Sequence, residues 1–101
     1  MGTRLQFQKL LSEIPEVKKA YFQAPEGVLM EYPSIVYNRD DTFKRFANNN
    51  PYIIVYRYLV TAIDKRPDSP IFRALELLPQ STFVRAYPKG DLNHQVFEIY
   101  F

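Results

Sequence analysis

The chain has 101 residues, of which 47% are hydrophobic and 24% charged, and this composition is typical of a single folded domain spanning residues 1–101. Its 13 Lys and Arg stand against 11 Asp and Glu, so the net charge is only +2 and non-specific binding to nucleic acid or to an anionic membrane is not indicated. The absence of cysteine excludes disulfides, thiolate metal sites, iron–sulfur clusters and cysteine catalysis. No apolar stretch is long enough to cross a membrane, so we expect a soluble chain made in the cytoplasm.

The N-terminal part predicts one helix followed by two short strands. Thr3 and Gln6 fit a capping box, and the apolar residues that follow share one helical face until Pro15 ends the pattern. These apolar residues are Phe7, Leu10, Leu11 and Ile14. Residues 17–23 are β-prone, and a second strand, bent around Pro33, would include residues 28–30 and 35–38.

The C-terminal half predicts a long strand, a second helix and a final hairpin. Residues 52–63 alternate aromatic and β-branched side chains on two largely apolar faces, so this strand is central in the sheet or meets another chain. Ser69 and Pro70 fit the start of a helix that Pro79 ends, and residues 81–87 and 94–101 form strands joined by a loop containing Gly90. Residues 39–50 are polar and predict a connection between strands. The expected fold class is α+β: a mainly antiparallel sheet of four to five strands with two short helices packed on one face (α-β-β-β-α-β-β).

Chemistry-bearing motifs are scarce. His94 is the only histidine, no serine lies in a nucleophile elbow, and the acidic residues lack the spacing of a metal loop. Only three glycines occur, too few for a phosphate-binding loop. We therefore predict no enzymatic activity, no catalytic or metal-binding residues and no cofactor. Basic and aromatic residues alternate at Tyr56-Arg57-Tyr58, which keeps a small nucleic-acid-binding module open as an alternative.

Several segments resemble small neck proteins of long-tailed bacteriophages, in particular the tail terminator or tail-completion proteins, which join tail to head. The resemblance runs from about Tyr32 to the end of the chain, and its most specific part is the ending LNHxxFxIYF. It rests on residues 32–41 (YPSIVYNRDD), 58–64 (YLVTAID), 66–69 (RPDS), 83–87 (FVRAY) and 91–101. The resemblance implies an α-β-β-β-α-β-β domain, without a catalytic constellation, that assembles into a homo-oligomeric ring, commonly a hexamer. Its expected partners are the tail tube protein and the head connector or head-completion protein, and its expected location is the virion neck.

The resemblance also implies where partners would make contact. It places a polar hairpin at Arg39, Asp40 and Asp41, continuing through the residues up to the Asn-rich turn, whereas the alternative is a solvated loop. The other expected interface residues are Lys44, Arg45, Asn48, Asn49, Asn50, Asn93 and His94. DNA would pass through the lumen of the ring without specific binding, and no membrane is involved. A head-closure or minor capsid protein is the alternative role within the virion.

Overall fold

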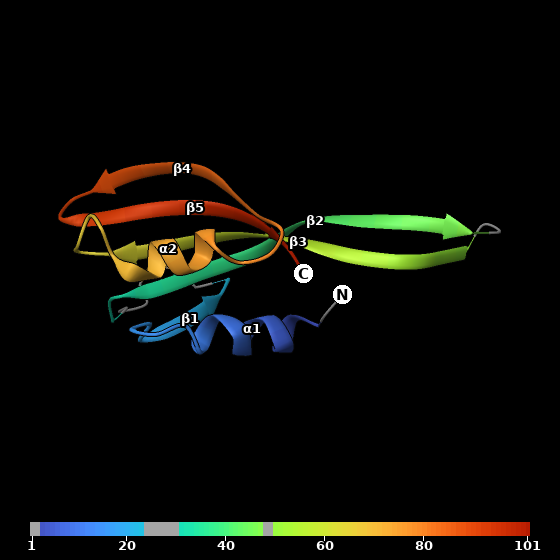
Figure 1. Ribbon diagram of the computed structural model, residues 1–101, viewed down its shortest axis with the longest axis horizontal. Helices are drawn as coiled ribbons and strands as arrows, with labels where there is room; N and C mark the ends of the chain where they lie inside the picture. The colour runs from blue at the N-terminus through green and yellow to red at the C-terminus, as the bar shows by residue number, and fades with distance from the viewer. Residues whose placement is uncertain (1–2, 24–30, 48–49) are drawn as a thin grey trace.

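The computed structural model describes residues 3–23, 31–47 and 50–101, and the elements in this part of the chain follow the predicted order (Figure 1). The helices are α1 (Arg4–Ser12) and α2 (Pro70–Glu76). The strands are β1 (Lys19–Phe22), β2 (Ser34–Ala47), β3 (Asn50–Asp64), β4 (Ser81–Lys89) and β5 (Leu92–Tyr100). The α+β class and the α-β-β-β-α-β-β order are confirmed.

The five strands form one sheet in the order β1-β2-β3-β5-β4. The pairs β2 with β3, β3 with β5, and β5 with β4 are antiparallel, whereas β1 runs parallel to β2. The prediction of a mainly antiparallel sheet is therefore confirmed, with β1 as the parallel exception. Strands β1 and β4 lie at the two edges of the sheet.

Local signals in the sequence account for both helices. The Thr3 hydroxyl accepts a hydrogen bond from the Gln6 amide at 3.2 Å, and the Gln6 side chain accepts one from the Thr3 amide at 2.9 Å, which completes the predicted capping box. The second helix has Ser69 at its N-cap and Pro70 as its first residue, as predicted.

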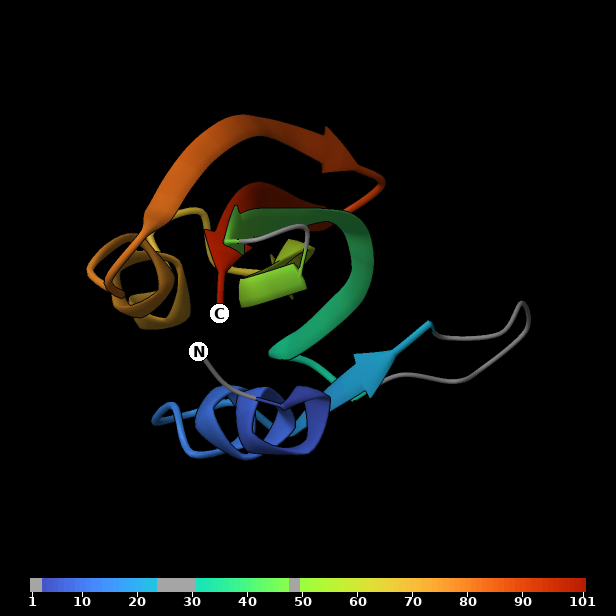
Figure 2. The ribbon, with the colours of Figure 1, turned by 90° about the vertical axis from the view of Figure 1, so that its right-hand side faces the viewer.

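Both helices pack on the same side of a curled sheet (Figure 2). From α1, the Phe7 ring lies 4.5 Å from the ring centroid of Tyr58 on β3 and 5.5 Å from that of Tyr37 on β2. From α2, Ile71 and Leu75 are fully buried in the same core. The core also contains the inward-facing residues of the central strands, namely Ile35, Val60, Ala62, Phe97 and Ile99.

The prediction that residues 39–50 form a connection is wrong for residues 39–47 and for Asn50, because β2 continues as a strand to Ala47 and β3 already begins at Asn50, while Asn48 and Asn49 lie outside the described residues. Pairing explains the difference: several of these residues have low strand propensity, yet Arg39 and residues 41–47 each have a partner residue on β3, which supplies backbone hydrogen bonds. A β-bulge between Arg39 and Asp41 marks where the hairpin leaves the body of the sheet.

The last two strands meet in a tighter turn than the sequence predicts. Pairing extends to Lys89 opposite Leu92, so only Gly90 and Asp91 remain in the turn rather than a six-residue loop. Gly90 has φ of +64°, the left-handed conformation that glycine adopts without strain. The glycine thus stands at the first central position of a two-residue hairpin, where type II′ turns require it.

Candidate functional site

The distal part of the β2–β3 hairpin projects beyond the body of the sheet, and we call it the arm (Figure 1). Strand β5 follows β3 only as far as the pair Arg57 with Tyr100, whereas β2 and β3 stay paired out to Ala47 with Asn50. The molecule is accordingly elongated, with extents of 52 × 26 × 22 Å. The arm is therefore a two-stranded ribbon, a structure that is marginally stable without further contacts.

Most of the predicted interface residues lie on the arm or at its base. Arg39, Asp40 and Asp41 lie at the base, and Lys44 is exposed farther along β2. The backbones of Arg45 and Asn50 belong to the two strands of the arm, whereas Asn48 and Asn49 lie outside the described residues.

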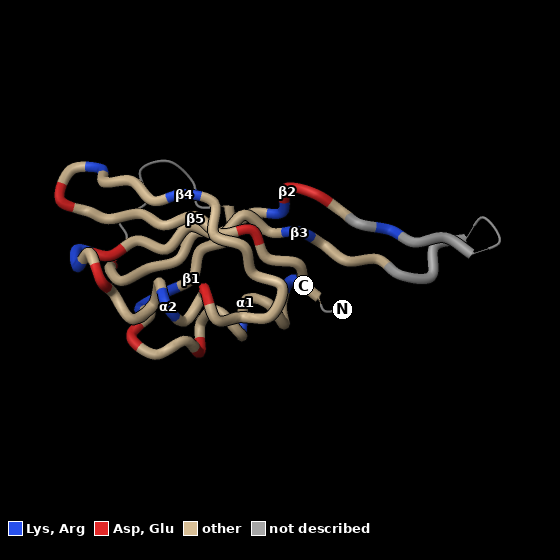
Figure 3. The backbone as a smooth tube through the Cα atoms, turned by 45° about the horizontal axis from the view of Figure 1, so that its top comes forward, with Lys and Arg blue, Asp and Glu red and all other residues tan. Residues whose placement is uncertain are grey.

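A cluster of charges, which we call the charged shoulder, sits at the base of the arm. It consists of Asp40, Asp41, Arg57 and Glu98. The Arg57 guanidinium donates to both Asp40 oxygens, at 3.0 and 3.2 Å, and lies 3.8 Å from Asp41 and 4.0 Å from Glu98. The hydrogen bonds to Asp40 raise the pKa of Arg57 further above its usual range. Three carboxylates face one guanidinium, so the shoulder is acidic overall, as the acidic segment of β2 in Figure 3 shows.

Arg39 faces away from the charged shoulder. Its guanidinium lies 3.8 Å from the ring centroid of Tyr56 and donates to the Tyr58 hydroxyl at 3.4 Å. Tyr58 is fully buried and Arg57 is bound to Asp40, so neither offers a free surface to a base. The Tyr56-Arg57-Tyr58 alternation therefore serves packing and ion pairing rather than a stacking platform for nucleic acid.

Asn93 and His94 lie at the opposite end of the molecule, near the β4–β5 turn, so the structure does not bring them together with the arm (Figure 1). The Asn93 side chain donates to the Lys65 carbonyl oxygen at 3.1 Å. The His94 ring stacks on Tyr87 with 4.8 Å between the ring centroids, and burial lowers the pKa of this histidine. Asn93 thus secures the final hairpin to the body, whereas His94 packs β5 against β4 within the hairpin.

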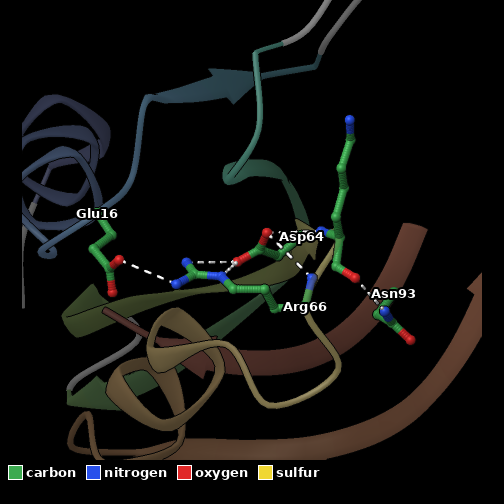
Figure 4. A network of polar contacts seen from close by, with 5 residues as sticks. Glu16, Asp64, Arg66 and Asn93 are labelled. Atoms are coloured by element: carbon green, nitrogen blue, oxygen red, sulfur yellow. Dashed lines mark hydrogen bonds and ion pairs between the residues drawn. The ribbon is translucent and has the colours of Figure 1, made fainter. Parts of the chain in front are cut away.

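A polar network that the sequence analysis missed ties three segments together close to this end (Figure 4). Arg66 donates to Asp64 at 2.9 and 3.1 Å and to Glu16 at 3.2 Å, and Asp64 also accepts from the Lys65 amide at 2.7 Å. Burial opposes ionisation of Asp64, but the hydrogen bonds from the Arg66 guanidinium and from two backbone amides outweigh it and lower its pKa. No local sequence pattern predicts the contact between Arg66 and Glu16, because fifty residues separate the two side chains along the chain.

Across residues 3–23, 31–47 and 50–101, no three His, Asp or Glu side chains gather closely enough to hold a metal ion. Neither described helix combines the length and apolar character needed to cross a membrane. Exposed apolar side chains instead concentrate on β4, which presents Phe83, Val84 and Tyr87.

Comparison with known proteins adds no relative: no protein-family model matches the chain, and no curated protein matches it.

Proposed function

We propose that this chain is a structural subunit of a bacteriophage neck: copies assemble into a ring, commonly of six, that ends the tail tube and joins the tail to the head connector. The arm is the observation that carries the proposal. A two-stranded ribbon extending from a small domain is marginally stable by itself and gains stability from contacts with another chain, and a subunit held between tube and connector has such neighbours.

Two further features support assembly into a ring. The sheet ends in two different edges, β1 with β2 on one side and β4 on the other, so contact between unlike edges is head-to-tail. Head-to-tail contacts close into a ring when the rotation between copies permits. The helices cover one side of the sheet only, which leaves the other side for neighbours.

The chain's charges fit a conduit through which DNA passes without specific binding. The net charge is +2, and Arg39 and Arg57 are engaged within the chain by aromatic rings and carboxylates. In the proposed assembly, the ring would therefore not grip the DNA that moves through its lumen.

Cryo-electron microscopy of virions containing this chain tests the proposal directly. We expect a ring of copies at the junction between head and tail, in contact with the tail tube protein and the head connector or head-completion protein. Location of the chain at the head side of the connector, or in the capsid shell, would contradict the proposal and favour a head-closure or minor capsid protein. A salt-dependent shift of DNA by the purified chain would favour a nucleic-acid-binding module.

A further inference from the structure

Strand β4 has the properties of an edge that binds another strand. It pairs only with β5, so its outer backbone groups have no partner strand in the described part of the chain. It also presents large apolar side chains to solvent: Phe83 is 48% exposed, Val84 43% and Tyr87 36%. An edge of this length with exposed apolar side chains is a template for strand addition.

The charge of β4 indicates what kind of strand it accepts. Arg85 and Lys89 are the only charged residues of β4, and both are basic and exposed. Arg85 lies 5.6 Å from the ring centroid of Tyr87, and in the residues that the structure describes neither cation forms an ion pair. The edge therefore favours a strand that carries carboxylates.

The outer edge of β2 offers such a strand. Its pairing with β1 ends at Tyr37, and Asp40 and Asp41 follow within the charged shoulder. The Asp41 side chain is 59% exposed, and its contact with Arg57 is long, at 3.8 Å. The carboxylate therefore remains accessible to a second cation. Strands β3 and β5 separate β2 from β4 within one chain, so each copy holds both complementary edges without being able to join them itself.

We propose that the β2 edge of one copy lies antiparallel along the β4 edge of the next copy, with Asp41 facing Arg85. With Asp41 opposite Arg85, the part of β2 that follows Asp41 lies along the first half of β4, from Arg85 back to Ser81, which spans about 17 Å. The antiparallel direction carries Lys44 toward Thr82, whereas a parallel one would place Lys44 beside the basic Lys89. This pairing rests on the self-association contained in the proposed function and identifies the contact that closes the ring.

Charge exchange tests the contact. We expect Asp41→Lys and Arg85→Glu each to weaken self-association by about tenfold or more in sedimentation velocity, and the double variant to recover it, because the ion pair is restored with reversed sign. Arg73→Glu, an exposed reversal on α2, is the matched control and should associate like the unchanged chain. Circular dichroism verifies that each variant is folded.

Disulfide trapping tests the direction and does not depend on charge. The chain has no cysteine, so introduced cysteines have no native competitor. A Lys44→Cys chain is mixed with a Ser81→Cys or a Thr82→Cys chain. Both positions are used because the bulge at Val84 adds one residue to β4 and so shifts by one the residue that lies opposite Lys44. We expect a disulfide-linked dimer of the two variants by mass spectrometry, and none when the second chain carries Pro88→Cys, the position that a parallel strand would reach.

The outcomes separate this contact from the proposed function. If the unchanged chain forms rings but both charge reversals assemble normally and only the Pro88 pair is trapped, the pairing is overturned while the ring proposal stands. If the unchanged chain stays monomeric at about 1 mM, where a contact with millimolar Kd would be half-populated, and no pair is trapped, both are overturned.

Discussion

At the scale of single residues, the most constrained side chain is the Asp64 carboxylate. Its side chain is 5% exposed, and it accepts hydrogen bonds from the Arg66 guanidinium and from the backbone amides of Lys65 and Arg66. The same arginine reaches Glu16 next to α1. One buried charge thus organises the turn between β3 and α2 and links it to the N-terminal region.

The substitution Asp64→Asn should lower the free energy of unfolding by about 2 kcal/mol at pH 7, because hydrogen bonds to a charged group are lost in a buried place. The folded-state pKa of Asp64 lies below its unfolded value, so its stabilisation is present above about pH 4 and is lost as the pH falls through the folded pKa. Urea unfolding between pH 7 and pH 2.5 should therefore show a shallower acid dependence in the variant. The exposed Asp68→Asn serves as control, and equal losses in the two variants would contradict this role.

His94 should make stability depend on pH in the same direction but in a higher range. Burial lowers its pKa, so the folded state disfavours the charged ring, and stability present above about pH 6.5 declines as the pH falls through the folded pKa. The substitution His94→Gln should remove this decline and cost about 1 kcal/mol at pH 7.5, where the stacking on Tyr87 is lost. Thermal unfolding at pH 5, 6 and 7.5 measures both effects, and an unchanged pH profile in the variant would refute the assignment.

At the scale of elements, α1 is attached to the sheet through two fully buried side chains, Phe7 and Leu11, of which Phe7 enters an aromatic cluster. Phe7 is fully buried, and its ring lies 5.0 Å or less from the ring centroids of Tyr58 and Phe101. In addition, Gln8 donates to the Ala20 carbonyl oxygen on β1 at 2.9 Å and accepts from the Tyr37 hydroxyl. A helix this short depends on such packing, because isolated helices of its length are unstable in water.

Replacing Phe7 by Ala should lower the free energy of unfolding by about 3 to 5 kcal/mol, since it removes a large ring from a closed aromatic cluster. Leu5→Ala is a matched control on the same helix, because Leu5 is 68% exposed and should cost about 0.5 kcal/mol or less. Urea denaturation followed by tyrosine fluorescence measures both. A loss below 1 kcal/mol for Phe7→Ala would mean that α1 is not part of the cooperative core.

At the scale of the whole molecule, the body and the arm have different roles. The body contains the core and both helices, whereas the arm is a ribbon beyond the reach of β5. Its surface can therefore change with little effect on folding, whereas in the proposed assembly the contacts with partners would depend on it.

Reversing Lys44 and Arg45 to Glu should impair the joining of heads to tails while shifting the free energy of unfolding by about 0.5 kcal/mol or less, because both residues lie on the arm, beyond the part of β3 that β5 covers, and Lys44 is exposed. In vitro complementation counts joined particles, and thermal unfolding of the purified variant verifies the fold. The matched control is Lys9→Glu with Arg73→Glu, a reversal of two exposed cations on the helices of the body. Normal joining with both arm reversals in place would show that this part of the arm is a solvated surface.

Much of the fold could be predicted because its signals are local. The Thr3 capping box, the Ser69-Pro70 helix start and the β-branched run of β3 each act through neighbours a few residues away, and the structure contains all of them. The candidate interface residues at the base of the arm follow instead from the resemblance to phage neck proteins, and they lie in a polar stretch beside a strong strand.

The sequence by itself thus determined the α+β class, both helices, the central strand and the final hairpin, because capping, periodicity and turn chemistry are encoded within a few residues. Tertiary structure alone decided the full length of β2, the parallel pairing of β1, and the contact of Glu16 with Arg66. Each of these depends on a partner distant in sequence, which can supply backbone hydrogen bonds or a counter-charge that overrides local propensity. Strand pairing therefore turned a polar stretch, which local propensity assigns to a loop, into the arm that defines the molecule's shape.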